Sequence, residues 1–462
     1  MDVPSLFPDF DPSSTSPADQ ATSQAAQTKV ARRLRRPDRE QGEIRCESLD
    51  MLLPPDDPAR IVWRFVETLD LQPLIDQIQS VEGRAGRDAL DPQVPMALWL
   101  LATIEGIGSA RALDEQCGLN LRYRWICGGL SVNYHSLSDF RTAHPQFLES
   151  VLVDTVASML REGLVSLTEV AQDGMRVRAS AGASSFRREP SLKECLKKAQ
   201  TQLDSLKAEA DAEASGQSAS QRTAREKAAR ERANQDRTDR IQRALDQRQQ
   251  LLDQRQQQKV EKGVKFDAEK IRTSTTDPDA RRIKMPDGGT RPAFNFQFAS
   301  ATGSGIVVGV AVTNSGSDAG QMGPMIDGIK DDYGISPDRS LVDGGFAVLD
   351  DIEHVQTTHE TKVYAPVKDE KKKLAKGENP YQPKPKDSPS IADWRLRMGT
   401  PEAKEIYKRR AQTAEWVNAG MRQRGLYQVV VRGLSKVTSV AYWHAIAHNL
   451  LRAVVLRAMQ SI

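Results

Sequence analysis

The sequence predicts an α/β region that is preceded by an all-α region and interrupted by a long helical insertion. From 52 to 164 the apolar residues recur at helical spacing. Between 165 and 425, outside the insertion, short strand signals alternate with helix signals. Within 191–260 the chain contains no Phe, Trp or Tyr, so this polar stretch cannot build a core of its own.

Length, net charge and the spacing of cysteines and histidines limit the classes of protein to which the chain can belong. A length of 462 residues predicts two to four structural units, and a net charge of +3 means that any basic surface must be local. Neither the cysteines (46, 117, 127 and 195) nor the histidines have the spacing of a structural zinc site, and we expect a reducing, cytoplasmic setting. No run of about 18 apolar residues exists, so no membrane contact is expected.

Residues 1–50 are predicted to form a disordered arm with a basic run at Lys29–Arg36, which either stays solvated or lies along DNA phosphates. Residues 51–164 are predicted to form a helical domain with helices over Asp91–Ile104, Ala110–Cys117, Leu121–Ile126 and Pro145–Arg161. Ser136 and Asp139 have capping-box spacing.

Short helices joined by glycine turns are typical of a helix-turn-helix-like bundle. Arg122, Arg124 and Arg141 would then face DNA phosphates. A plain helical packing domain is the alternative.

The insertion, 188–265, is predicted to form two long helices packed as a coiled-coil-like hairpin, with a break at Ala214–Ala219. It is mildly basic, because 15 Lys and Arg stand against 11 Asp and Glu over 191–260. It either projects from the main domain or contacts DNA or another subunit.

The segments 165–187 and 266–430 are predicted to form one α/β domain, followed by a C-terminal helix within 431–462. The expected order begins with strands at Val165–Asp173 and Met175–Ala179 and a hairpin of Ala293–Phe298 and Ile306–Thr313. It continues with a helix at Gly320–Lys330, a strand at Ser340–Asp343, a helix at Phe346–Val355 and a strand at Lys362–Pro366. A loop over 367–400, a helix at Pro401–Gly425 and an edge strand at Tyr427–Arg432 complete it. This order is that of a ribonuclease-H-like mixed sheet with helices on both faces, in which the first and fourth strands are neighbours.

Three carboxylates are candidates for a metal site. Asp173 and Asp343 each end an apolar run and precede a glycine, so each is predicted at the C-terminal edge of a buried strand, where the chain turns away. Glu415 lies in the later helix. Taken singly, an Asp-Gly pair is also an ordinary turn and a helical Glu is also an ordinary surface residue.

The chain resembles bacterial insertion-sequence transposases of the DDE type over roughly 90 to 460. The resemblance is carried by Tyr123–Trp125, His135–Arg141, Asp173 and Gly174, Asp277–Arg281, Gly288 and Gly289, Phe294–Gln297, Asp343–Gly345, the helix with Tyr407, Arg410 and Glu415, Arg432 and Gly433, and Ala447–Leu451. One large branch of that family has a Y-R-E-K signature with three residues between Arg and Glu. Here four residues separate Arg410 from Glu415, which shifts Arg410 about 100° around an ideal α-helix. Arg422 stands in place of the lysine.

The resemblance implies metal-dependent cleavage of DNA and transfer of a 3′-hydroxyl to target DNA, with two Mg2+ ions (Mn2+ as a substitute) held by oxygen ligands. Asp173 would be shared by both ions, and Asp343 and Glu415 would each complete one site. Arg410 and Arg422 would hold backbone phosphates or stabilise a flipped or bent DNA end.

Other residues have two interpretations each. Tyr407 either stacks on a base or packs in the core, and Asn295 and Gln297 either support the site or satisfy the sheet. His448 and Asn449 are expected to form a core pair rather than a metal site.

The expected partners are double-stranded DNA, as terminal inverted repeats and target, and a second copy of the chain, because two element ends are handled together. The expected location is the bacterial cytoplasm, at the nucleoid when bound to DNA. A catalytically silent DNA-binding regulator and another two-metal nuclease are the alternatives. A nucleotide hydrolase is disfavoured, because the chain has no GxxxxGK[ST] run.

Overall fold

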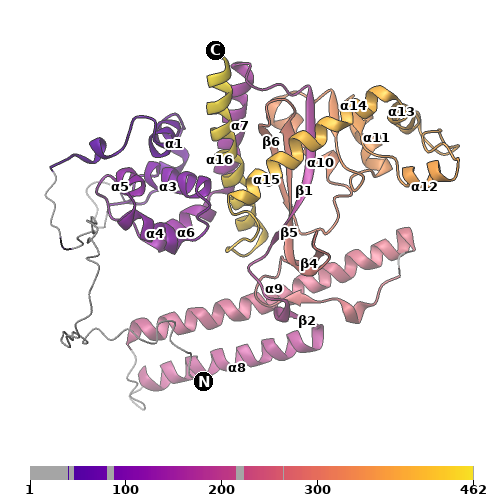
Figure 1. Cartoon of the computed structure of the whole chain (residues 1–462). Coiled ribbons are helices and arrows are strands. Elements are labelled where there is room, and N and C mark those ends of the chain that lie inside the picture. Colours follow the sequence, from indigo (N-terminus) through magenta and orange to yellow (C-terminus); the bar gives the residue numbers. More distant parts are fainter. Residues whose placement is uncertain (1–39, 41–45, 81–87, 215–222, 264, 461–462) are drawn as a thin grey trace, which may run out of the picture. The chain divides into compact units, whose positions relative to one another are not determined.

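The computed structural model describes residues 40, 46–80, 88–214, 223–263 and 265–460 (Figure 1), and its helices and strands all fall within Ser48–Ile462. Most of the predicted N-terminal arm, including Lys29–Arg36, lies outside the described residues. So does nearly all of the predicted break between the two insertion helices.

The N-terminal part is helical, as predicted. Its elements are a 3-10 turn (Leu49–Leu52), α1 (Pro58–Glu67), α2 (Gln72–Ile75), α3 (Gln93–Ile104), α4 (Ala110–Leu119), α5 (Leu121–Cys127), α6 (Tyr134–Ala143) and α7 (Pro145–Arg161). Helix α3 is buried on nearly every side because its sequence is apolar all round, and the indole of Trp99 donates to the carbonyl of Leu137 at 2.8 Å. The predicted capping box is wrong: Asn133 caps α6 by accepting from the backbone of Ser136, which places Ser136 inside the helix.

A mixed sheet follows the helical part. Its strands are β1 (Glu169–Arg178), β4 (Arg281–Lys284), β5 (Thr290–Ala301), β6 (Val307–Thr313), β7 (Arg339–Leu341) and β8 (Lys362–Tyr364), and a separate pair joins β2 (Phe186–Arg187) to β3 (Thr273–Ser274). Strand β5 pairs antiparallel with β1 on one side and with both β4 and β6 on the other. On its second side β1 runs parallel to β7, and β7 runs parallel to β8. The first strand of the sheet is therefore central.

One predicted strand end is wrong. Asp173 does not end a strand, because β1 continues through Gly174 to Arg178 as a single strand. The long partner β5 causes this, since it pairs with β1 in unbroken register, with Asp173 opposite Phe298 and Gly174 opposite Gln297. The predicted hairpin of β5 and β6 is confirmed.

The remaining helices are α10 (Met322–Tyr333), α11 (Leu349–Thr358), α12 (Glu370–Ala375), α13 (Pro389–Met398), α14 (Pro401–Arg410), α15 (Trp416–Gln423) and α16 (Leu434–Gln460). The predicted loop over 367–400 is wrong, because it contains α12 and α13. Ser388 caps α13, Pro389 begins it, and the buried Trp394 anchors it. The predicted edge strand near 430 is reduced to one bridge between Arg178 and Gln428.

Helix α16 joins the helical part to the sheet, because it contacts α3, α6 and α7 as well as β6. The ring of His448 bonds to the carbonyl of Gly305 at 2.9 Å, and the amide of Asn449 bonds to both the N–H and the carbonyl of Val307. The prediction of a core pair is confirmed.

The insertion contains two helices in mutual contact, α8 (Glu189–Ala214) and α9 (Ala224–Lys262). Thr223 and Glu226 form a capping box at the start of α9. Few side chains of the pair are buried; Leu192, Leu203 and Ile241 are among them. The two helices therefore expose most of their length.

Candidate active site

Asp173 is a half-buried residue in the middle of β1. Its Oδ1 accepts from the N–H of Gly174 at 3.0 Å, and its Oδ2 accepts from the amide of Asn418 at 2.9 Å. Burial raises the pKa of Asp173 and the nearby charge of Asp343 adds to it, although Arg410, Gly174 and Asn418 act in the opposite direction. Two like charges thus lie close enough to interact.

Asp343 lies two residues beyond the end of β7, where the chain turns. Its backbone carbonyl accepts from Phe346, and its Oδ1 accepts from the N–H of Gly345 at 2.7 Å. Because β7 runs beside β1, this turn brings Asp343 near Asp173 across 170 residues of sequence. The charge of Asp343 contributes, after burial, to the raised pKa of Asp173.

A third aspartate, Asp318, links the two Asp-Gly pairs. It lies in the loop between β6 and α10, and its side chain is 8% exposed. A Cβ built on Gly174 would overlap its carboxylate, and a Cβ built on Gly345 would lie 3.6 Å from its Oδ2. The carboxylate of Asp318 therefore packs against both glycines.

Asp318 is held by three donors from neighbouring strands. Its Oδ1 accepts from the amides of Asn295 at 2.8 Å and Gln297 at 2.7 Å, and its Oδ2 pairs with Arg176 at 2.7 Å. Gln172 adds a bond from its amide to Gln297 at 3.2 Å. Asn295 and Gln297, predicted as supporting residues, thus contact Asp318 rather than Asp173.

Arg410 lies at the end of α14 and faces the same acidic pair. Burial alone lowers the pKa of Arg410, but Tyr407, Asp173 and Asp343 raise it, so the net shift is upward. Its Nε bonds to the hydroxyl of Tyr407 at 3.4 Å, and Tyr407 also packs against the hydrophobic core. The buried Nη1 of Arg410 has no partner among the described residues. A donor is thus available beside two carboxylates.

A neighbouring arginine fixes α14 against the sheet. Both oxygens of Glu169, at the start of β1, accept from the guanidinium of Arg409, at 2.7 Å and 2.6 Å. Such a bidentate pair restricts both distance and orientation. Arg409 therefore holds the helix in place while Arg410 faces the aspartates.

Glu415 closes a π-helical turn, Ala411–Glu415, between α14 and α15. In a π-turn the backbone bonds join residues five apart, so Arg410 and Glu415 are related as residues four apart are in an α-helix. Asn418, which contacts Asp173, lies three residues after Glu415 and so on a neighbouring part of the same face. Glu415 itself is exposed and forms no bond to another described residue.

The predicted DNA-contacting arginines differ in their surroundings. Arg124 and Arg422 are exposed and form no ion pair with a described residue. Arg122 pairs with Asp57 and Glu105, each at 3.0 Å. The remaining member, Arg141, is 6% exposed, with its guanidinium 4.5 Å from the ring centre of Trp99. Because its charged group is enclosed, Arg141 does not fit the prediction of a phosphate-facing residue.

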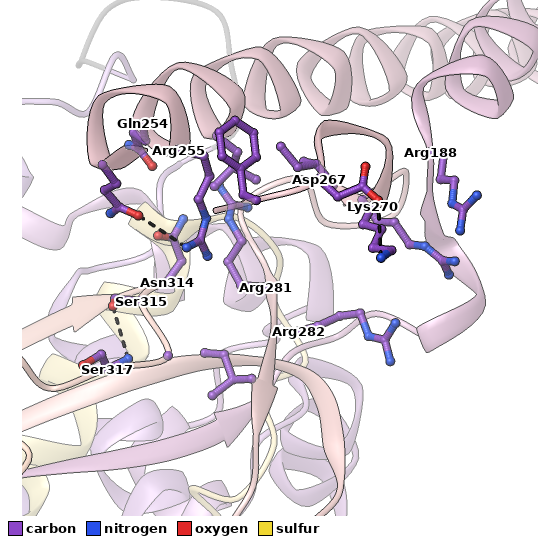
Figure 2. Close-up of a pocket in the computed structure, with 17 residues that line it drawn as sticks. Arg188, Gln254, Arg255, Asp267, Lys270, Arg281, Arg282, Asn314, Ser315 and Ser317 are labelled. Carbon is purple, nitrogen blue, oxygen red and sulfur yellow. Dashed lines mark hydrogen bonds and ion pairs between the residues drawn. The ribbon is translucent and has the colours of Figure 1, made fainter. Parts of the chain in front are cut away.

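A separate basic pocket of about 1060 Å3 lies between α9, the segment that follows it, β4 and the loop after β6. Figure 2 shows its residues, and none of the candidate carboxylates is among them. Its lining includes six cations, Arg188, Arg255, Lys270, Arg272, Arg281 and Arg282, against one acid, Asp267. The side chains of Arg188, Arg272 and Arg282 are exposed and form no hydrogen bond or ion pair with another described residue.

The loop after β6 connects this pocket with the carboxylates. Ser315 and Gly316 line the pocket, and Asp318, two residues further on, packs against Gly174. Arg176 donates both to the carbonyl of Gly316 at 3.2 Å and to Asp318. The pocket and the acidic site therefore lie at the two ends of one short segment.

Asp318, Arg176 and Asn418 were missed from the sequence. Asp318 had a usable signal, because it follows the apolar strand β6 after the turn residues Asn314–Ser317, much as Asp343 follows β7. Asn418 had no such signal in the sequence, because its contact with Asp173 depends on how α15 packs.

Two comparisons with known families match opposite ends of the chain. Residues 47–143 match a family described as a transposase domain (DUF772), and residues 375–454 match one described as a transposase DDE domain. No curated protein and no solved structure gave a match. Among the described residues, no helix is both long and apolar enough to cross a membrane.

Proposed function

We propose that this chain, which belongs to the insertion-sequence transposases of the DDE type, binds the ends of its element and catalyses metal-dependent strand cleavage and strand transfer. One observation carries the proposal: the charges of Asp173, Asp343 and Arg410, which come from three distant segments, act on one another, and Glu415 follows Arg410 through a π-turn. Divalent metal is general in this family, and carboxylate oxygens are the ligands that Mg2+ prefers.

The strand order supports a ribonuclease-H-like catalytic domain formed by 165–187 and 266–430. If the short strand β4 is set aside as an addition, β1 is antiparallel to the next strand, β5, and parallel to β7, which is the pairing that this fold has between its first, second and fourth strands. We assign 51–164 to a helix-turn-helix-like DNA-binding domain, 188–265 to a helical insertion and 431–462 to a C-terminal helix.

The residues present fit a pair of Mg2+ ions. We assign Asp173 as the shared ligand, with Asp343 and Glu415 each completing one site. Burial raises the pKa of Asp173 and the charge of Asp343 adds to it, and two bound cations would offset both effects. When bound, the ions would stabilise the entering and leaving oxygens of an in-line displacement at phosphorus.

The spacing of Arg410 and Glu415 supports the assignment of Glu415. The family signature has Arg and Glu four positions apart on an α-helix. Here they are five apart, and the π-turn absorbs the extra residue. The shift of about 100° that an ideal helix would impose is thereby removed.

The chain's own cations position the DNA. The buried Nη1 of Arg410 has no partner among the described residues, so we assign it to a phosphate oxygen, and Arg422 is exposed at the end of α15. We extend the DNA path along the loop after β6 into the basic pocket, because three of its arginines have no protein partner among the described residues. Arg124 remains a candidate contact in the helical domain; Arg141 is left out because it is buried, and Arg122 because it is already paired.

The test is Mg2+- or Mn2+-dependent cleavage of DNA that carries the element's two ends. We expect Asp173→Asn, Asp343→Asn and Glu415→Gln each to abolish cutting while binding persists. Glu405→Gln is the matched control, because Glu405 lies on α14 and pairs with Lys408 at 2.6 Å. A wild-type chain that binds the ends but never cuts would favour the regulator. Cutting without strand transfer or preference for the ends would favour another two-metal nuclease.

A further inference from the structure

Three side chains away from the candidate active site converge on one point. Asp327 lies on α10, His354 lies on α11, and His359 caps the end of α11. The Nε2 atoms of both histidines lie close to the same oxygen, Oδ1 of Asp327, at 2.8 Å for His354 and 2.6 Å for His359. The three ligand atoms are all within 4.8 Å of one another.

The other nitrogen of each ring is also engaged. Nδ1 of His359 lies 3.1 Å from the hydroxyl of Ser336, and Nδ1 of His354 lies 3.3 Å from the hydroxyl of Thr358. Metal-binding histidines are oriented in this way, with a hydrogen bond at one ring nitrogen and the metal at the other. Both rings thus direct Nε2 toward the cluster.

We propose that Asp327, His354 and His359 bind one Zn2+ ion through two nitrogens and one oxygen, with water as a fourth ligand. Imidazole nitrogen favours Zn2+, whereas Mg2+ prefers oxygen and keeps its water. The side chains of His354 and Asp327 are 41% and 42% exposed, which gives an ion access, while His359 is 7% exposed and fixed.

The position of the cluster gives the ion a structural role. Helix α10 begins four residues after Asp318, and α11 begins six residues after Asp343. The helices are already joined at their starts, where Asp351 of α11 accepts from the backbone N–H groups of Met322 and Gly323. A metal ion one turn further along fixes the two helices together and so restrains the loops that carry Asp318 and Asp343. Binding of Zn2+ to this cluster does not depend on the proposed catalytic activity.

The test is Zn2+ titration of the full chain, free of any polyhistidine tag, by calorimetry in saturating Mg2+. Mg2+ is added because it would fill the proposed carboxylate site, and the loss of Zn2+ binding in the cluster variants identifies the second site. We expect His354→Gln and Asp327→Asn to lose this Zn2+ site, with affinity reduced about 100-fold or more. His135→Gln is the matched control, since His135 is exposed on α6. Wild-type binding in both variants, or no Zn2+ binding by the wild type, would overturn the proposal and leave an ordinary hydrogen-bonded cluster.

Two further readouts separate binding from folding. Co2+ in the same site should give visible ligand-field absorption that His354→Gln removes, and the half-exposed His354 makes this variant the one best able to fold. Zn2+ should raise the Tm of the wild type and of His135→Gln but not that of His354→Gln. Binding without a change in Tm would overturn the clamping role alone.

Discussion

Arg176 of β1 and Asp318 of the loop after β6 form an ion pair at 2.7 Å, with their side chains 19% and 8% exposed. The same carboxylate accepts from Asn295 and Gln297 and packs against the glycines that follow Asp173 and Asp343. An ionised carboxylate offers only acceptors, and Arg176, Asn295 and Gln297 each donate to this one. Asp318 therefore positions two segments that carry candidate metal ligands.

Asp318→Asn should test this role. The change leaves the mostly buried guanidinium of Arg176 without its counter-charge and turns one acceptor into a donor that faces other donors. We expect the free energy of unfolding to fall by about 3 kcal/mol, and cleavage to fall with it. Urea unfolding measures the first. Asp393→Asn is the control, because Asp393 is 66% exposed and pairs only along its own helix; its effect should stay below about 1 kcal/mol. Equal effects of the two changes would contradict a positioning role.

The two glycines after Asp343 provide a matched pair. A Cβ at Gly345 would lie 2.9 Å from Oδ1 of Asp343, whereas a Cβ at Gly344 would meet nothing within 4 Å. We expect Gly345→Ala to displace the Asp343 carboxylate and to reduce cleavage at least about 100-fold, since small misplacements of catalytic groups have effects of that size. Gly344→Ala should remain close to wild type. Metal-dependent cleavage, with circular dichroism to verify folding, measures both, and equal activities would refute the argument.

Much of the fold was predictable from local pattern. The apolar runs of β6 and α3 indicate buried elements, and the phenylalanines at alternate positions of β5 indicate a strand. The end of β1 was not predictable in this way. Asp173 and Gly174 have the composition of a turn, yet pairing with the longer β5 outweighs that local preference.

The sequence predicted several residues of the candidate site, but it did not predict the contacts that position them. Asp343 occupies the expected turn after a strand. The docking of α14 by Glu169 and Arg409, and the buried position of Arg141, depend on contacts between residues far apart in sequence. The spacing of Arg410 and Glu415 also made a role for Arg410 less secure, because the positions were compared on an ideal α-helix without a π-turn.

The π-turn makes a prediction about chain length. Removing the exposed Gln412 should convert Ala411–Glu415 into ordinary α-helix and give Arg410 and Glu415 the usual four-residue relation, with α15 still in register. We expect this deletion to keep at least about a tenth of the wild-type cleavage rate. Deletion of the exposed Lys408, within the regular helix α14, should rotate Tyr407 about 100° relative to Arg410 and abolish cleavage. If the variant that lacks Gln412 folds and binds DNA but does not cleave it, the spacing argument is contradicted.

Asp277 should make the stability depend on pH. Its Oδ1 accepts from the N–H of Gly433 at 3.2 Å, and burial raises the pKa of Asp277 to about 6, above the ordinary value of 3.8. Because the folded pKa is the higher one, the protonated form favours folding; this stabilisation is complete below about pH 4 and is lost as the pH rises through about 6. Asp277→Asn should therefore be more stable than the wild type at neutral pH, by up to about 3 kcal/mol, and equal to it near pH 4. Urea unfolding across this range measures the difference. Asp287→Asn, at an exposed carboxyl, is the control, and a gain that does not vary with pH would contradict the assignment.

The basic pocket should contribute to DNA affinity through charge alone. Arg272 and Arg282 are exposed and unpaired among the described residues, so each can neutralise one phosphate without first breaking an ion pair. Arg272→Ala and Arg282→Ala should each lower the slope of log K against log salt by about 1, for specific and nonspecific DNA alike. Arg291→Ala is the control, because Arg291 is exposed but already paired with Asp287. Fluorescence anisotropy over a salt series measures these slopes. An unchanged slope in both pocket variants would place the DNA elsewhere on the chain, and loss of binding to only one sequence would indicate contacts with bases in place of phosphates.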